Sequence, residues 1–153
     1  MKRLFASAIV VGLLSVVAVA QSKDPLVGTW KLNVAKSTGL SYKSGTTKIE
    51  AAGAGVKFDV ELVGTDGTAH KWSFTANYDG KDNPVTGNSP YGDTVALERV
   101  DAHTIRTTGK LGGKTVSTQT IVVAADGKTR TTTTKGTDAK GQKVDSVSFY
   151  EKQ

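Results

Sequence analysis

The sequence predicts an all-β protein, an antiparallel up-and-down barrel of about 8–10 strands. No eleven-residue window shows a convincing apolar period of 3.6 residues, whereas apolar and polar residues alternate in several segments, as in strands with one buried face. Glycine and Asp-Gly turn signals separate these segments at intervals of 13 to 15 residues, enough for one strand and its turn. Because an open sheet of this size would expose two edges, we expect it to close.

The N-terminal segment has the layout of a secretory signal peptide. Two basic residues precede an uncharged, largely apolar run of 17 residues that ends in Ala18-Val19-Ala20, a small-x-small cleavage site. An uncleaved anchor is the alternative, but this run is short for a membrane span, which needs about 20 residues. We predict a cleaved signal peptide at 1–20 and a single barrel domain at 21–153, located in the periplasm or secreted, with no stable membrane anchor.

Composition and charge limit the classes of partner. The chain has 20 Lys and Arg against 14 Asp and Glu, a net charge of +6 that falls to +4 without the two basic residues of the signal peptide. These charges are dispersed and form no basic stripe with interleaved aromatics, which argues against nucleic-acid binding. The chain has no cysteine, which excludes disulfides and thiol chemistry. We expect a monomer of about 133 residues, a usual size for one domain.

The alternation and the turn signals together place the strands. In chain order they are predicted at 27–34, 45–52, 55–64, 68–78, 94–100, 103–111, 114–124, 128–137 and 143–152, with a short additional strand at 84–87. Two connections are too long for hairpins. Residues 35–44 are rich in Gly, Ser and Lys, and residues 82–93 contain two prolines, so no long strand or helix is expected in 82–93. A loop of this length serves either as a rim or lid or as a solvated crossover.

The segments 55–64 and 68–78 carry the strongest alternation and most of the aromatic residues. Phe58 lies on the apolar face of the first, and Trp72, Phe74 and Tyr78 lie on one face of the second. These four side chains are candidates for lining a ligand cavity, since small-molecule pockets are mostly apolar. An ordinary packed core is the alternative, because side chains alone can fill a barrel of eight strands.

The segment 128–137 is threonine-rich and has no hydrophobic face. Arg130, Thr132 and Thr134 alternate with Thr129, Thr131 and Thr133. Threonine favours strands but contributes little burial. This strand is therefore either an exposed edge or a wall between bulk water and a hydrated cavity.

Both ends of the mature chain resemble calycin proteins, the superfamily of lipocalins and intracellular fatty-acid-binding proteins. Val27-Gly-Thr-Trp-Lys-Leu32 resembles their first strand, and Phe149-Tyr-Glu-Lys152 resembles the tail of the fatty-acid-binding proteins. The resemblance implies a lipocalin-like barrel in which Gly28 and Trp30 close one end. A direct ligand contact is the alternative role for Trp30. The chain also resembles a group of small exported bacterial proteins of undefined role that share this barrel.

The resemblance also implies a ligand contact for Tyr150, but the tail departs from the family pattern. The position of the family's carboxylate-binding arginine is Ser148 here, so that clamp is missing. The apolar pair Val147 and Phe149 alternates with Tyr150, which leaves open which face of the last strand points inward. The connection 35–44 is also too short for the two-helix lid of the fatty-acid-binding proteins.

No motif for catalysis, metal binding or cofactor binding is present. His70 and His103 are the only histidines, no metal-ligand spacing surrounds them, and the chain has neither a nucleophile elbow nor a phosphate loop. We predict an exported, non-enzymatic barrel that binds a small, largely apolar ligand without a cofactor or metal. The alternative is a structural or interaction protein of the envelope, with a filled barrel and no ligand.

Overall fold

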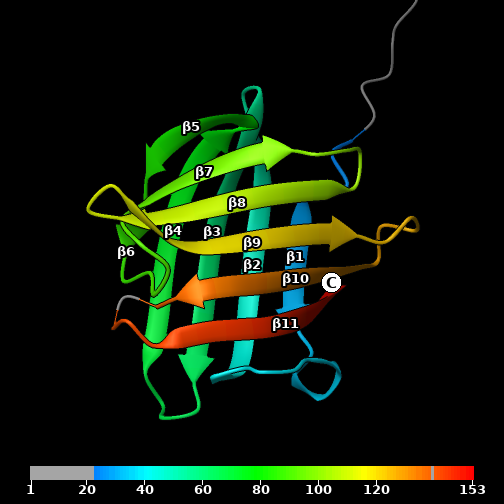
Figure 1. Ribbon diagram of the computed structural model, residues 1–153. Coiled ribbons are helices and arrows are strands. Elements are labelled where there is room, and N and C mark those ends of the chain that lie inside the picture. Colours follow the sequence, from blue (N-terminus) through cyan, green and yellow to red (C-terminus); the bar gives the residue numbers. More distant parts are fainter. Residues whose placement is uncertain (1–22, 139) are drawn as a thin grey trace, which may run out of the picture.

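A computed structural model describes residues 23–138 and 140–153, and the predicted signal peptide lies outside these residues (Figure 1). Strands make up most of the described chain. They are β1 (Gly28–Leu32), β2 (Tyr42–Ala52), β3 (Gly55–Gly64), β4 (Ala69–Asn77), β5 (Asp79–Pro84), β6 (Thr86–Gly87), β7 (Thr94–Arg99), β8 (Thr104–Leu111), β9 (Lys114–Val123), β10 (Thr129–Thr137) and β11 (Lys143–Lys152). A short 3-10 helix, η1 (Val34–Lys36), follows β1. None of the helices in this part of the chain has the length and apolar character needed to span a membrane.

The strands form one antiparallel sheet that curves into a nearly closed barrel, which confirms the predicted fold class. Their order is β5-β7-β8-β9-β10-β11-β1-β2-β3-β4-β6. The first strand, β1, lies between β11 and β2 and so joins the hairpins of the N-terminal half to the meander β7–β11 (Figure 1). On the other side, β4 lies against β5 and β7, which brings the two ends of the sheet together.

Alternation produces the walls of the barrel as predicted. In β3 the apolar residues Val56, Phe58, Val60 and Leu62 are all buried, whereas Lys57 and other intervening charged residues face outward. One face of each strand thus packs in the interior, and the other meets water. Each predicted strand is present with ends within three residues of those expected.

The main difference from the prediction is β5, because the sequence predicted a loop over 82–93. This strand lies at the end of the sheet order, pairs with β7 alone, and has a register irregularity between Asp79 and Asp82. Proline is tolerated in such an edge strand, so Pro84 can end it without breaking a central ladder. The threonine-rich β10 is no edge, since it pairs with both β9 and β11.

A polar cluster fastens the segment before β1 to the barrel. The Asp24 carboxylate accepts hydrogen bonds from the Tyr78 hydroxyl and the Leu26 amide, and it also pairs with the Arg99 guanidinium. The guanidinium carbon of Arg99 lies 3.9 Å from the centre of the Tyr78 ring. Both members of the ion pair are mostly buried. Asp24 thus connects the segment before β1 to β7 and to Tyr78, the residue between β4 and β5.

Replacing Asp24 by alanine is expected to lower the free energy of unfolding by about 1.5–3 kcal/mol, because it leaves a partly buried hydroxyl and guanidinium without their acceptor. Chemical denaturation in urea measures the change. Glu61→Ala is the control, because Glu61 pairs with Lys71 on the exposed surface and such pairs contribute about 0–1 kcal/mol. Equal losses in the two variants would contradict a special role for Asp24.

Candidate functional site

Side chains leave a cavity of about 80 Å³ inside the barrel. A cavity of this size holds several water molecules, since one water needs about 10–15 Å³ on this measure. It is smaller than pockets for drug-sized ligands, which range over about 300–1,000 Å³. The lining side chains come from both halves of the barrel and fall into an apolar wall and a polar wall.

The apolar wall comes mainly from β3 and β4. The rings of Phe58 and Phe74 are stacked with their centroids 4.7 Å apart, and Trp72 lies on the same strand as Phe74. Further apolar lining residues are Val60, Leu62, Val85, Val95 and Ile121. The alternation that buries one face of β3 and β4 therefore also builds one side of the cavity.

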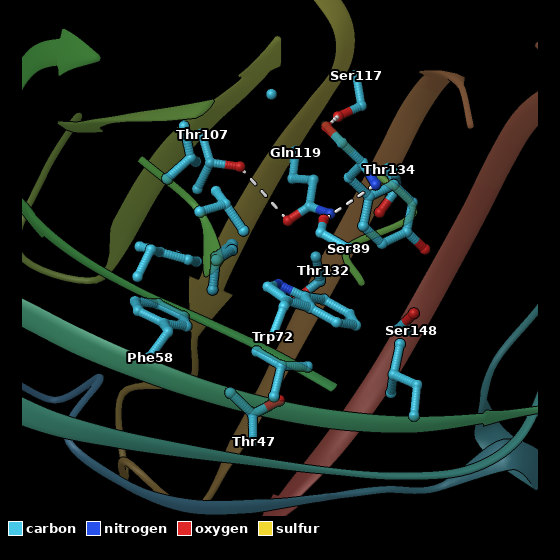
Figure 2. Close-up of a pocket in the computed structure, with 18 of the residues that line it drawn as sticks. Thr47, Phe58, Trp72, Ser89, Thr107, Ser117, Gln119, Thr132, Thr134 and Ser148 are labelled. Carbon is cyan, nitrogen blue, oxygen red and sulfur yellow. Dashed lines mark hydrogen bonds between the residues drawn. The ribbon is translucent and has the colours of Figure 1, made fainter. Parts of the chain in front are cut away.

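The polar wall comes from β8, β9, β10 and β11. Its uncharged members are Thr107, Ser117, Gln119, Thr132, Thr134 and Ser148, with Thr47 contributed by β2 (Figure 2). The Thr107 hydroxyl donates to Oε1 of Gln119 over 3.4 Å. The inward face of β10 is polar, as expected for a strand that separates bulk water from a hydrated cavity.

Arg130 supplies a positive charge to the polar wall. Its side chain lines the cavity, and the residue is only 4% exposed. Nη1 makes a long hydrogen bond of 3.4 Å to Oγ1 of Thr132, and Nε has no hydrogen-bond partner. No carboxylate of residues 23–138 and 140–153 forms an ion pair with it. Burial lowers the pKa of Arg130 to about 10, so the guanidinium stays charged at neutral pH.

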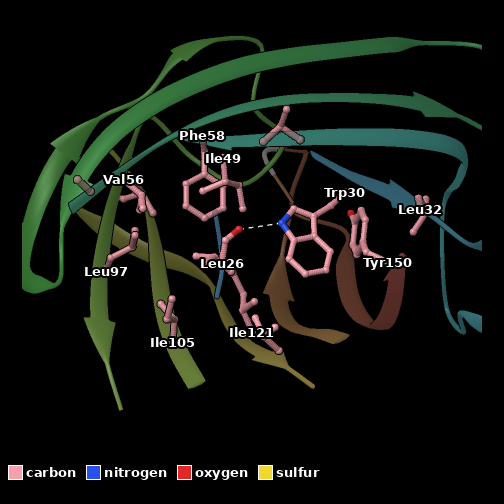
Figure 3. Close-up of a cluster of buried hydrophobic side chains, with 14 of the residues drawn as sticks. Leu26, Trp30, Leu32, Ile49, Val56, Phe58, Leu97, Ile105, Ile121 and Tyr150 are labelled. Atoms are coloured by element: carbon pink, nitrogen blue, oxygen red, sulfur yellow. Dashed lines mark hydrogen bonds between the residues drawn. The ribbon is translucent and has the colours of Figure 1, made fainter. Parts of the chain in front are cut away.

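Two aromatic residues of the core pack against the Arg130 guanidinium. The guanidinium carbon of Arg130 is 4.1 Å from the ring centre of Tyr150 and 5.4 Å from that of Trp30. Trp30 is fully buried, and its Nε1 donates to the Leu26 carbonyl over 2.8 Å (Figure 3). The Lys152 ammonium lies 4.7 Å from the Trp30 ring centre. The buried Trp30 ring is therefore in contact with two cations, from β10 and β11.

Gly28 belongs to the same arrangement. Its φ of +145° is one that residues with a side chain rarely adopt, and a Cβ there would lie 2.9 Å from Cε of Lys152. The Lys152 ammonium donates to the carbonyls of Pro25 and Val27 over 3.1 and 2.9 Å. Glycine at position 28 thus gives the Lys152 stem room to cross β1 and reach the segment before it.

The segment 88–93, which we call the strap, covers part of the cavity. It supplies Ser89 and Tyr91 to the lining, and the Tyr91 hydroxyl donates to the hydroxyl of Tyr42 over 3.1 Å. Burial raises the pKa of Tyr91 well above 10, and that of Tyr42 is also raised by burial, so both rings are neutral at neutral pH. A Cβ at Gly92 would lie 2.2 Å from the Lys110 carbonyl, so only glycine lets the strap approach β8 this closely.

Four of the five candidate binding residues lie together at the cavity. Phe58, Trp72, Phe74 and Tyr150 line it, whereas Tyr78 is absent from the lining and binds Asp24 instead. The inward face of β11 carries Tyr150 and Ser148. Phe149 on the opposite face lies under the Lys36 ammonium, 5.1 Å from its ring centre.

Sequence reasoning missed Arg130, Tyr42, Tyr91 and Gln119 as lining residues. The alternation of β10 placed Arg130 on the same face as Thr132, but nothing in the sequence marked that face as the inward one. The tyrosines come from the start of β2 and from the strap, where no periodic pattern indicates direction. Only Arg130 could have been noticed in the sequence, because it is the one charged residue on a strand face that otherwise carries Thr132 and Thr134.

No group of three or more His, Asp or Glu residues is arranged to hold a metal ion in the part of the chain that the structure describes. The His70 ring packs edge-on against Tyr42, 5.9 Å between ring centres, and His103 lies between β7 and β8. The chain matches no protein-family model, and no curated protein is significantly similar to it.

Proposed function

We propose that this protein is an exported, non-enzymatic barrel of the calycin kind that binds a small molecule in its interior. The observation that carries the proposal is the cavity of about 80 Å³, which the side chains of a nearly closed barrel leave unfilled. An apolar wall on one side and a polar wall on the other suit an amphipathic molecule, because polar groups fix its orientation while apolar contacts bury its body.

The size of the cavity limits which molecules can be the ligand. A long-chain fatty acid does not fit a volume of about 80 Å³, whereas a molecule of a few non-hydrogen atoms does. The aromatic residues Phe58, Trp72 and Phe74 support a ligand with an apolar part. The ionisable lining groups are Arg130 and three tyrosines whose pKa values burial raises, so none exchanges a proton near neutral pH. This supports binding over acid–base catalysis.

The alternative function is a structural or interaction protein of the envelope that holds no ligand. Its support is the small cavity, which is well below the range of drug-sized pockets. The two proposals differ in what filling the cavity does. In a ligand-binding barrel, a larger side chain that fills the cavity abolishes ligand binding. In a structural barrel, the same change only improves the packing of the interior.

Thr132→Leu is expected to abolish binding of small probes, because Thr132 is buried in the polar wall and leucine adds volume there. Amide NMR titration with butyramide and 1-butanol measures binding, and native mass spectrometry of protein from its natural compartment detects a retained ligand. Thr131→Leu is the matched control, since Thr131 is the neighbouring residue on the outward face. Wild type and Thr131→Leu should show saturable shifts. If wild type shows neither saturable shifts nor a retained mass, the ligand-binding proposal is wrong.

A further inference from the structure

Arg130 places one positive charge at the cavity without a balancing negative charge. Buried charges are costly unless they are paired and hydrogen-bonded. The lining of the cavity contains no aspartate or glutamate, and within residues 23–138 and 140–153 the only hydrogen bond from this guanidinium is the 3.4 Å contact to Thr132. Within the described residues, the buried guanidinium therefore lacks a negatively charged partner.

The contacts that Arg130 does make leave its hydrogen-bonding capacity unused. Tyr150 and Trp30 meet the guanidinium through their ring faces, at 4.1 and 5.4 Å from the guanidinium carbon. Such cation–π contacts stabilise the charge but use none of the five N–H donors, which lie in the guanidinium plane. Packing on the two rings thus holds the group in place while its donors stay open to an acceptor.

We propose that the cavity binds a small organic monoanion, a carboxylate or sulfonate, whose anionic group accepts hydrogen bonds from Arg130. The inference rests on the proposed function, since it names the class of ligand for the same cavity. A planar guanidinium matches two oxygens of such a group, and charge-assisted bonds of this kind are roughly twice as strong as neutral ones. Hydroxyl groups of Thr132 and Ser148 line the same wall as further donors.

Charge and size select a monoanion with a short apolar part. One guanidinium neutralises one negative charge, so a phosphate dianion would leave a net negative charge buried in the barrel. The apolar wall around Phe58, Trp72 and Phe74 gives the remainder of the ligand a surface that an inorganic anion does not use. The volume of about 80 Å³ limits that remainder to a short chain.

A comparison of butyrate with butyramide distinguishes the effect of ligand charge on affinity from the effect of ligand size. The two molecules are similar in size, and only butyrate is an anion. By NMR titration of the whole mature chain, butyrate is expected to bind wild type at least about tenfold more tightly than butyramide. The Arg130 Nε–H resonance should shift on saturation. Arg130→Met should weaken butyrate binding at least about tenfold and leave butyramide binding within about threefold. Arg130→Lys should give an intermediate loss.

Arg106→Met is the control for a change of charge alone, because Arg106 is an exposed residue on β8 that pairs with Glu98. It should bind butyrate as wild type does. Equal affinities for butyrate and butyramide, or full butyrate binding by Arg130→Met, would overturn the anion site while leaving the proposed function standing. Failure of both probes to bind wild type would overturn the anion site, and together with no 1-butanol binding and no retained mass it would also overturn the proposed function. Displacement of butyrate by an equal concentration of inorganic phosphate would overturn the assignment to organic monoanions.

Discussion

Trp30→Ala is expected to lower the free energy of unfolding by about 3–5 kcal/mol, the usual cost of truncating a fully buried Trp. Trp30 has no exposed surface and packs in the core with Leu26, Ile49 and Tyr150. Truncation also removes the donor to the Leu26 carbonyl. Urea denaturation monitored by circular dichroism measures the change. A loss below about 1 kcal/mol would show that Trp30 does not hold the core together.

Trp72→Ala is the matched control, since Trp72 is the only other tryptophan in the sequence. Trp72 is half-buried at the cavity, so its removal should cost less than that of Trp30, about 1–2 kcal/mol. The two variants also differ in binding. Trp72→Ala should change the affinity for cavity probes directly, whereas Trp30→Ala should act through stability.

Arg130→Met is expected to act in the opposite direction and raise the free energy of unfolding at pH 7 by about 1–3 kcal/mol. Replacing a buried charge by an apolar side chain of similar volume is often stabilising by about 1–4 kcal/mol. Burial lowers the pKa of Arg130 to about 10, which reflects a cost to the charged form in the folded protein. The lost contacts with Tyr150 and Trp30 offset part of this gain. Urea denaturation of both proteins measures the difference.

The pH dependence of this difference identifies its cause. Below about pH 10 the Arg130 guanidinium is charged in both the folded and the unfolded chain, so its full cost is present. Above about pH 10 the folded protein loses this proton before the unfolded chain does. The unfolded chain then binds more protons, and the wild type gains stability relative to the variant. The gap should therefore narrow between pH 7 and pH 10.5. A gap that stays constant, or a variant less stable than wild type at pH 7, would contradict an unpaired buried charge.

A side chain that destabilises the fold and points into its cavity is typical of a functional residue. Natural proteins often accept a loss of stability where activity requires it. For Arg130, the substitution by methionine should raise the free energy of unfolding and weaken butyrate binding at least about tenfold. Those two measurements on one variant link the energetics of the barrel to its proposed function.

The strands were predictable from local sequence patterns. For a strand with two polar faces, the sequence did not predict which face points into the barrel. Alternation of Val56, Phe58, Val60 and Leu62 decides which face of β3 is buried, because only one face is apolar. In β10 neither face is apolar, so the inward position of Arg130 depends on its neighbours β9 and β11 in the barrel. The edge strand β5 was missed because a strand with one partner tolerates residues that a central strand excludes.

The aromatic residues of the site were predictable from the same alternation of apolar and polar residues that predicts the core. Phe58, Trp72 and Phe74 lie on faces that alternation assigns to the interior, and they line the cavity. Tyr78 follows the same period in the sequence, but β4 ends at Asn77, and its ring turns to Asp24 instead. A periodic pattern places side chains only as far as the strand continues.

The position of β1 between β11 and β2 has a consequence for the order of folding. The pairing of Trp30 with Lys152 joins residues from nearly opposite ends of the chain, and contacts of such long sequence separation form slowly. Hairpins within β2–β4 and β7–β11 need only short loop closures and can form first. We therefore expect Trp30 to gain its contacts with β11 late in folding, after these hairpins have formed.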